Sequence, residues 1–486
     1  MNMEQQTERP NILFVMADQL RHDACGFENR FDMHTPRIHE LARQGVRYTD
    51  AVSMAPLCGP FRASLLSGCF SSTTGYVVNE VRARTDLPAL AGCLNDNGYR
   101  SAYVGKWHLY ASEKKVLGKA GDFHQNPKNQ FVPKGEDRLG FDDFWAAYNF
   151  NHNYYNGFYY MDKPERHAMD GYEPDVMTDV AVEQLETYAE ADDPFFMCVS
   201  YGTPHQPWEE GNVPVEWFKL FDDVEFGYPD TYRDSSAPWW HEWFDREWWV
   251  ENIKPNIPKW QKIYHAMTAN LDWNVGRLLD ALSINNMVDN TIVVFTSDHG
   301  EMFGAQGRVQ KNIFYDEAER VPFIMRWPGH IPHSMLSDAC LNTPDIMPTL
   351  LSLAGVEIPE SVQGTDLAHT ALGKPGADKD HALLQGMGVS VDWLDGHEWR
   401  ALRSKRYTYG MFRDGTEELF DNVRDPLQKQ NLAQVTQYRS TAEKYREILS
   451  ERLGAIDDSF MNMTWYRDNW IENGAVCGDR VDGKRR

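Results

Sequence analysis

The chain has 486 residues, 42% of them hydrophobic, which is enough for two or three domains and a large buried core. It carries 48 Lys and Arg against 72 Asp and Glu, and this formal net charge of −24 argues against nucleic acid or an anionic membrane as a partner. An anionic substrate would have to be held by positive charge gathered locally, from a metal ion and a few basic side chains.

The seven cysteines are widely spaced and form no CxxC or Cys/His finger pattern, which is typical of a reduced, cytosolic interior. The apolar run Ile12 to Ala17 is as long as a strand and is not a signal peptide. No run approaches the roughly 18 apolar residues of a membrane span. We therefore expect no membrane partner and a cytoplasmic location, with a periplasmic or secreted one open if an export signal has been removed.

Strands and helices are predicted to alternate along most of the chain. The predicted strands are residues 11–17, 101–107, 194–201, 290–297 and 321–327. The predicted helices are residues 35–45, 87–98, 175–191, 259–284 and 345–354. This alternation is typical of an α/β fold with a large, mostly parallel central sheet flanked by helices.

The pattern changes after about residue 372. Residues 373–380 read as a polar linker, and antiparallel strands are predicted over 400–411 and 417–420, with a turn at Asp414-Gly415. A helix is predicted over 441–453. We therefore predict two domains: a large α/β domain, 1–372, and a smaller C-terminal α+β subdomain with an antiparallel sheet, 373–486.

Polar residues follow the ends of several predicted strands: Asp18, Lys106, His205 and Asp298. Open α/β sheets bind ligands at the carboxyl edge of their strands. These four positions, far apart in the sequence, are therefore predicted to lie at one site.

Several short motifs add chemistry to that site. In Cys58-Gly59-Pro60-Phe61-Arg62, a helix starting at the cysteine would place Cys58 and Arg62 on one face. The other motifs are Gly105-Lys106-Trp107-His108-Leu109, Thr203-Pro204-His205-Gln206-Pro207-Trp208, Asp298-His299-Gly300-Glu301 and Lys311-Asn312-Ile313-Phe314-Tyr315.

In this order, from Asn11 to about Ala433, the motifs resemble those of the type I sulfatases of the alkaline-phosphatase-like superfamily, whose signature is C-x-P-x-R. The resemblance implies a hydrolase of sulfate esters. It also implies that a formylglycine-generating enzyme oxidises Cys58 to formylglycine (3-oxoalanine), at a helix start that favours an anion. Hydration of this aldehyde gives a diol nucleophile, and collapse of the sulfated diol releases sulfate.

The resemblance also assigns roles to individual residues. It implies one divalent ion held by Asp18, Gln19, Cys58, Asp298 and His299, with Gln19 standing where a second aspartate often sits. Oxygen ligands favour Ca²⁺, and the imidazole leaves Mg²⁺ or Mn²⁺ open. The implied catalytic residues are Cys58, Arg62, Lys106, His108, His205 and Lys311. Of these, His108 would accept the diol proton, and Lys311 or His205 would protonate the leaving alcohol.

The expected substrate is a small sulfated molecule, with a mono- or oligosaccharide favoured. The chain has 16 tryptophans, and indole faces suit sugar rings. The predicted sugar-binding aromatics are those of residues 141–160 and Trp239, Trp240, Trp243, Trp248 and Trp249. The alternatives are a phosphonate monoester or phosphodiester hydrolase, an aryl- or choline-type sulfatase, and a non-catalytic binding protein on the same scaffold.

Overall fold

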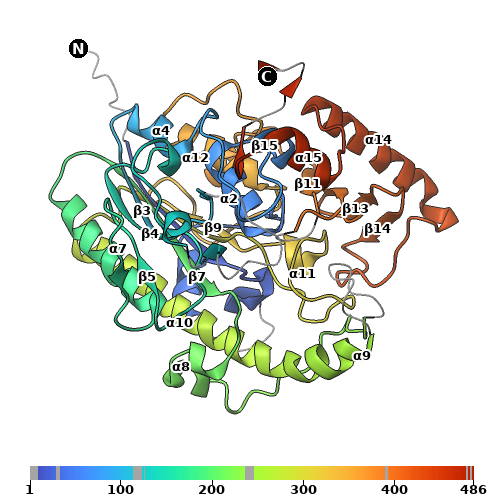
Figure 1. Ribbon diagram of the computed structural model, residues 1–486, viewed down its shortest axis with the longest axis horizontal. Helices are drawn as coiled ribbons and strands as arrows, with labels where there is room; N and C mark the ends of the chain where they lie inside the picture. The colour runs from blue at the N-terminus through green and yellow to red at the C-terminus, as the bar shows by residue number, and fades with distance from the viewer. Residues whose placement is uncertain are drawn as a thin grey trace.

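The computed structural model describes residues 9–28, 33–112, 123–124, 126–235, 246–388, 392–477, 480–481 and 484–485. An eight-stranded sheet, in the order β10-β2-β9-β8-β1-β7-β3-β4, forms its centre (Figure 1). The strands are β1 (Asn11–Asp18), β2 (Val46–Tyr48), β3 (Arg100–Lys106), β4 (Phe144–Tyr148), β7 (Phe195–Pro204), β8 (Thr291–Ser297), β9 (Phe323–Arg326) and β10 (Met335–Ser337). Within this sheet only β9 pairs antiparallel with its neighbours, so the predicted mostly parallel sheet is confirmed.

Helices cover both faces of this sheet because its strands are apolar on both sides. In β1, Ile12 and Phe14 face one hydrophobic core, and Leu13 and Val15 face the other, as the two-residue period of a strand requires. The first core contains α2 (Cys58–Ser67), α4 (Leu90–Asn95) and α12 (Thr343–Leu353). The second contains α1 (Pro36–Arg43), α7 (Glu173–Ala189) and α10 (Ile257–Ile284).

A second, four-stranded sheet follows in the C-terminal part. Its strands are β11 (Ala382–Gly386), β12 (Trp399–Arg403), β13 (Tyr407–Phe412) and β14 (Glu417–Asp421), all antiparallel and in sequence order. The single strand predicted over 400–411 was wrong, because the chain turns at Ser404, whose N–H donates to the carbonyl of Tyr407 at 2.9 Å. The two halves therefore form the hairpin β12–β13. Strand β11 was not predicted.

The small sheet packs on both of its faces. Helix α14 (Arg439–Ala455) covers one face, where Leu449 joins Leu402 and Tyr409 (Figure 1). The other face meets residues 313–315, where Phe314 joins Trp399. Helix α15 (Met463–Trp470) returns to the first core of the large sheet. The boundary at residue 372 stays a prediction.

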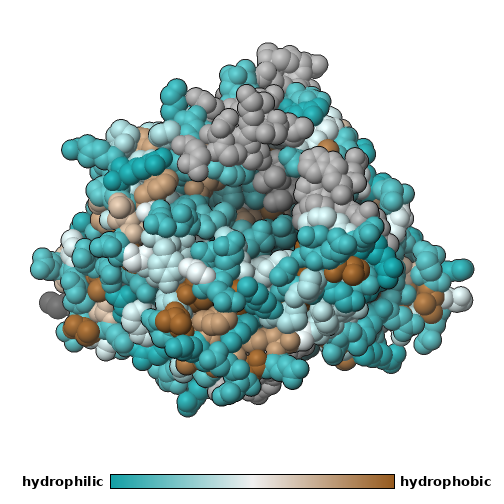
Figure 2. Space-filling view, turned by 60° about the horizontal axis from the view of Figure 1, so that its bottom comes forward, coloured by the Kyte–Doolittle hydropathy of each residue, from teal (hydrophilic) through white to brown (hydrophobic). Residues whose placement is uncertain are grey.

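The remaining described α-helices and strands are short. They are α3 (Ser71–Thr74), α6 (Pro127–Gln130), α8 (Val215–Lys219), α9 (Arg246–Trp248), α11 (Asp316–Glu319), α13 (Ala368–Ala371), β5 (Phe158–Tyr159), β6 (His167–Ala168), β15 (Ile471–Glu472), β16 (Ala475–Val476), β17 (Arg480–Val481) and β18 (Lys484–Arg485). The face in Figure 2 is mainly hydrophilic and is hollowed near its centre. None of the described helices combines the length and the apolar character that crossing a membrane needs.

Candidate active site

Four neighbouring strands bring polar side chains to one edge of the large sheet. Asp18 ends β1 and Lys106 ends β3, while His205 follows β7 and Asp298 follows β8. These strands are adjacent in the order β8-β1-β7-β3 and run parallel. The structure therefore brings these four residues together at the carboxyl edge, as the sequence predicted.

Cys58 reaches the same place as the first residue of α2, and its side chain is buried. The proline at position 60 is tolerated because the first helical turn leaves its N–H groups unpaired. The N–H of Gly59 donates to Asn79 Oδ1 at 2.9 Å, which satisfies one of them. A Cβ on Gly59 would lie 2.3 Å from the Tyr76 ring, so only glycine fits there.

Two carboxylates, an imidazole and the cysteine form a buried cluster. The ligand atoms of Asp18, Cys58, Asp298 and His299 all lie within 4.8 Å of one another. Cys58 Sγ is 3.2 Å from His299 Nε2 and 3.7 Å from Asp18 Oδ1. Burial lowers the pKa of His299 well below its usual value, so its imidazole is neutral and able to bind a metal. Burial and the charge of Asp18 raise the pKa of the Cys58 thiol to about 11.

Gln19 was predicted to join this cluster as a metal ligand, but its side chain has other partners. Lys311 Nζ donates to Gln19 Oε1, and Gln19 Nε2 donates to Glu301 Oε2, both at 2.6 Å. Its backbone N–H donates to Asp298 Oδ1 at 2.9 Å. Gln19 thus connects the cluster, through its backbone N–H, to Lys311, through its side-chain oxygen.

Arg62 and Lys106 supply the positive charge next to the two carboxylates. Arg62 Nη2 donates to Asp18 at 3.3 Å and to Asp298 at 3.2 Å, and Lys106 Nζ donates to Asp18 at 2.6 Å. Burial alone would raise the pKa of Asp18, but the charges of Lys106 and Arg62 hold it well below its usual range. The pKa of Asp298 is raised by burial and by the charge of Asp18.

His205 and Lys311 form a pair on one side of Cys58. His205 Nδ1 lies 2.7 Å from the carbonyl oxygen of Gln206, which can only accept, so Nδ1 carries the proton. His205 Nε2 then accepts from Lys311 Nζ at 2.9 Å. Burial, followed by the charge of Lys311, lowers the pKa of His205 well below its usual value.

His108 lies on another side of Cys58, and its backbone φ of 59° is positive. The hydroxyl of Tyr76 donates to the backbone carbonyl of His108 at 2.8 Å. The imidazole ring of His108 meets the ring of Phe150 edge-on, with centroids 5.2 Å apart. Its Nδ1 is buried and has no hydrogen-bond partner among the described residues. Burial, together with Lys106 and Arg62, lowers the pKa of His108 well below its usual value.

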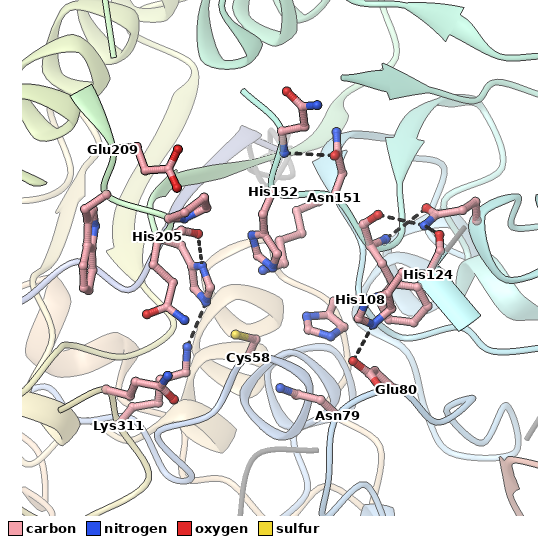
Figure 3. Close-up of a pocket in the computed structure, with 18 of the residues that line it drawn as sticks. Cys58, Asn79, Glu80, His108, His124, Asn151, His152, His205, Glu209 and Lys311 are labelled. Atoms are coloured by element: carbon pink, nitrogen blue, oxygen red, sulfur yellow. Dashed lines mark hydrogen bonds and ion pairs between the residues drawn. The ribbon is translucent and has the colours of Figure 1, made fainter. Parts of the chain in front are cut away.

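These groups lie at the base of a cavity of about 840 Å³ (Figure 3). Cys58, Lys106, His108, His205 and Lys311 all line it. Four other lining residues were not predicted from the sequence: Asn79, Glu80, His124 and Glu209. Asn151 and His152 also line the cavity and lie within the predicted stretch 141–160, although neither was named individually. His152 follows shortly after the end of β4, which runs parallel to β3 and therefore ends at the same edge of the sheet. Strand β4 was not predicted from the sequence, so this signal was not used.

The aromatic side chains of the cavity only partly match the prediction. Phe150 and Phe158, within the predicted stretch 141–160, line it. Among the described residues, the tryptophans that line it are Trp208 and Trp260. Trp249 is buried in the second core, and Trp248 packs against that core. Trp239, Trp240 and Trp243 lie outside the described residues.

Comparisons with known proteins point to one family. A family model described as Sulfatase matches residues 10–356, and one described as N-sulphoglucosamine sulphohydrolase, C-terminal, matches residues 304–454. An ulvan-active sulfatase of Formosa agariphila is 33% identical over 96% of this chain and 85% of its own length. An endo-4-O-sulfatase of Bacteroides thetaiotaomicron is 29% identical over 98% of this chain and 96% of its own. A crystal structure of a protein assigned as the sulfatase yidJ, from Bacteroides fragilis, has a TM-score of 0.80 and 29% identity, and the match covers 96% of this chain and 99% of that one.

Proposed function

Because this chain belongs to the sulfatase family and is a hydrolase of sulfuric esters, we propose that it removes sulfate from a sulfated saccharide, with position 58 as the nucleophile. One observation carries the proposal. Position 58 lies beside a buried acidic cluster and faces a cavity that Lys106, His205 and Lys311 also line. A tetrahedral anion in this cavity would meet positive charge and hydrogen-bond donors on several sides.

We infer that Cys58 acts as formylglycine, made by a formylglycine-generating enzyme. The hydrated aldehyde would supply a hydroxyl nucleophile and could expel sulfate by collapsing back, whereas a serine would leave a stable sulfate ester. Two observations support this maturation. The sequence around Cys58 is C-x-P-x-R, and all seven cysteines are free of disulfides.

The donor set at position 58 suits one divalent cation. Asp18, Asp298, His299 and the oxidised side chain of residue 58 would hold it, and Gln19 would have to exchange its bond from Lys311 to join them. Mostly oxygen donors favour Ca²⁺, with Mg²⁺ or Mn²⁺ as alternatives. The cation would polarise the bound oxygens and favour the ionised nucleophile.

The remaining residues would place charge and move protons. Lys106 and Lys311 would neutralise the sulfate oxygens, and Arg62 would orient the carboxylates. As the S–O bond to the alcohol breaks, Lys311 would give that oxygen a proton, because His205 is neutral and its one N–H is bonded to the Gln206 carbonyl. His108 would take the proton released when the diol collapses and sulfate departs.

A saccharide is the favoured alcohol for two reasons. The relatives include proteins described as an ulvan-active sulfatase and an endo-4-O-sulfatase. The cavity combines aromatic faces, such as Phe150 and Trp260, with amide and carboxylate groups that suit hydroxyls, such as Asn151 and Glu209.

Mass spectrometry of the protein produced with and without a formylglycine-generating enzyme tests the maturation. Trypsin cleaves after Arg47 and Arg62, so Cys58 lies in peptide 48–62. We expect this peptide to be about 18 Da lighter in the matured protein. Sulfatase activity should rise with the converted fraction and be absent in Cys58→Ala. Full activity from a preparation with only the cysteine mass would contradict the proposal.

A substrate panel tests the rest. Sulfated mono- and disaccharides, 4-nitrophenyl sulfate and a matched phenylphosphonate ester would be compared by kcat/KM. We expect the highest value for a sulfated saccharide. A higher value for the phosphonate ester would instead favour the phosphonate hydrolase alternative.

A further inference from the structure

His152 lines the cavity but takes no part in the proposed mechanism. It lies in the loop between β4 and β5, and Figure 3 shows it above Cys58, between His205 and His108. Its side chain is exposed, whereas Cys58 and Lys106 are 1% exposed and Lys311 is 4% exposed. His152 therefore lies farther out than the anion-binding groups, where the alcohol part of an ester would be.

The ring of His152 stacks on that of His205, with centroids 4.3 Å apart and planes inclined by 13°. The two imidazoles differ in what their nitrogens can do. Both nitrogens of His205 are engaged, one by the Gln206 carbonyl and one by Lys311. The ring nitrogens of His152 make no hydrogen bond to any residue in the described part of the chain, so they can bond a ligand.

The loop holds His152 in place from both sides. On one side, Gln130 Nε2 donates to the Phe150 carbonyl at 2.8 Å, and the Phe150 N–H donates to Gln130 Oε1 at 3.2 Å. On the other side, the Tyr154 hydroxyl donates to the carbonyl of Gly202 at 3.1 Å and also contacts that of His205. These bonds tie one end of the loop to Gln130 of α6 and the other end to the segment that carries His205, so the site for a ligand is preorganised.

We propose that His152 is a specificity-determining residue that hydrogen-bonds a saccharide hydroxyl next to the scissile ester. This inference rests on the proposed function. A neutral imidazole presents one donor and one acceptor, which is the complement of a hydroxyl group. The stack on His205 places this donor and acceptor beside the group that holds Lys311, and therefore close to the reacting sulfate.

Two substitutions separate hydrogen bonding from stacking. His152→Phe keeps an aromatic ring over His205 and removes both nitrogens. His152→Gln removes the ring and keeps a donor and an acceptor. Tyr155→Phe is the loop control, because Tyr155 is exposed, belongs to the same loop and does not line the cavity.

Each variant would be assayed on 4-nitrophenyl sulfate, which has no hydroxyl group, and on the saccharide that the wild type cleaves best in the panel. For His152→Phe we expect kcat/KM on the saccharide to fall by about tenfold or more, mainly through KM. The same variant should stay within about threefold of wild type on 4-nitrophenyl sulfate. His152→Gln should recover part of the saccharide activity, and Tyr155→Phe should match the wild type on both.

The other outcomes overturn the inference. Equal losses on both substrates would mean that His152 acts on the sulfate centre through His205. Wild-type activity of His152→Phe on the saccharide would leave only a stacking role. Hydrolysis of 4-nitrophenyl sulfate without hydrolysis of any saccharide would overturn the saccharide assignment and this inference together, and would leave the sulfatase assignment standing.

Discussion

At the scale of single residues, Arg62 carries much of the charge balance of the site. Its Nη2 group donates to both buried carboxylates, those of Asp18 and Asp298. Its Nη1 group donates to the Lys106 carbonyl and to the Ser200 hydroxyl, each at 2.7 Å. Such a set of contacts needs a planar group with several donors in fixed directions. Lysine has the same charge but a different geometry.

Arg62→Lys should therefore impair the enzyme although the charge is kept. We expect kcat/KM on 4-nitrophenyl sulfate to fall by about 100-fold or more, because the acidic pair loses its orientation. The free energy of unfolding should fall by about 1–3 kcal/mol, because buried acceptors lose their donors. Steady-state kinetics and urea unfolding measure the two effects.

Arg100→Lys is the matched control, because Arg100 makes a partly exposed ion pair with Asp143 far from the cavity lining. Surface pairs of this kind contribute little to stability. A similar activity for Arg62→Lys and Arg100→Lys would contradict the role given to Arg62.

At the scale of elements, the segment after Lys311 is held between the two sheets. Trp399 Nε1 donates to the Asn312 carbonyl at 3.1 Å, and the rings of Phe314 and Trp399 meet edge-on at 5.1 Å. A Cβ on Gly410 of β13 would lie 2.2 Å from the Phe314 ring. The small sheet thus helps to place Lys311, although none of the proposed catalytic residues belongs to it.

Gly410→Ala tests whether the small sheet positions Lys311, although Gly410 does not line the cavity. The added methyl group should push Phe314 and displace Lys311, lowering kcat by about tenfold or more. Overpacking should also cost about 1–3 kcal/mol of stability. Kinetics and thermal unfolding of the purified variant measure both changes.

Gly454→Ala in α14 is the control, because no atom lies within 4 Å of the added Cβ. Alanine also has the higher helix propensity, so this variant should keep its activity and its stability. If Gly410→Ala kept the wild-type kcat, the small sheet would have no part in placing Lys311.

At the scale of the whole molecule, an anionic protein is proposed to bind an anionic substrate. The formal net charge is −24, while Arg62, Lys106 and Lys311 act only inside the buried site. The short-range attraction of these groups is little screened by salt. The long-range repulsion from the rest of the surface is screened within about 8 Å at 0.15 M ionic strength.

Raising the ionic strength should therefore speed substrate capture. Between about 0.01 and 0.15 M salt, we expect kcat/KM to rise by about two- to fivefold, and more steeply for doubly than for singly sulfated saccharides. Initial rates at low substrate concentration and constant pH measure this rise. A fall of kcat/KM with salt would mean that local attraction dominates capture.

The sequence alone determined the α/β class and the alternation of strands and helices that builds the large parallel sheet. It also determined the convergence of Asp18, Lys106, His205 and Asp298 at one edge of that sheet. The spacing of apolar residues, the turn residues and the polar residues at strand ends are all local features of the sequence. Polar residues at the ends of parallel strands meet because such strands all end at one edge of the sheet. The motif around Cys58 pointed to the same place by another route, its resemblance to the sulfatase signature.

Tertiary packing decided the features that join distant segments. The bonds of Gln19 to Lys311 and Glu301 and the stack of His152 on His205 join residues that are far apart in the sequence. No local pattern encodes such contacts, because they depend on which loops the folded core brings together. The general chemistry of the site was therefore readable from the chain, while the stack that places His152 beside the reacting sulfate appears only in the folded protein.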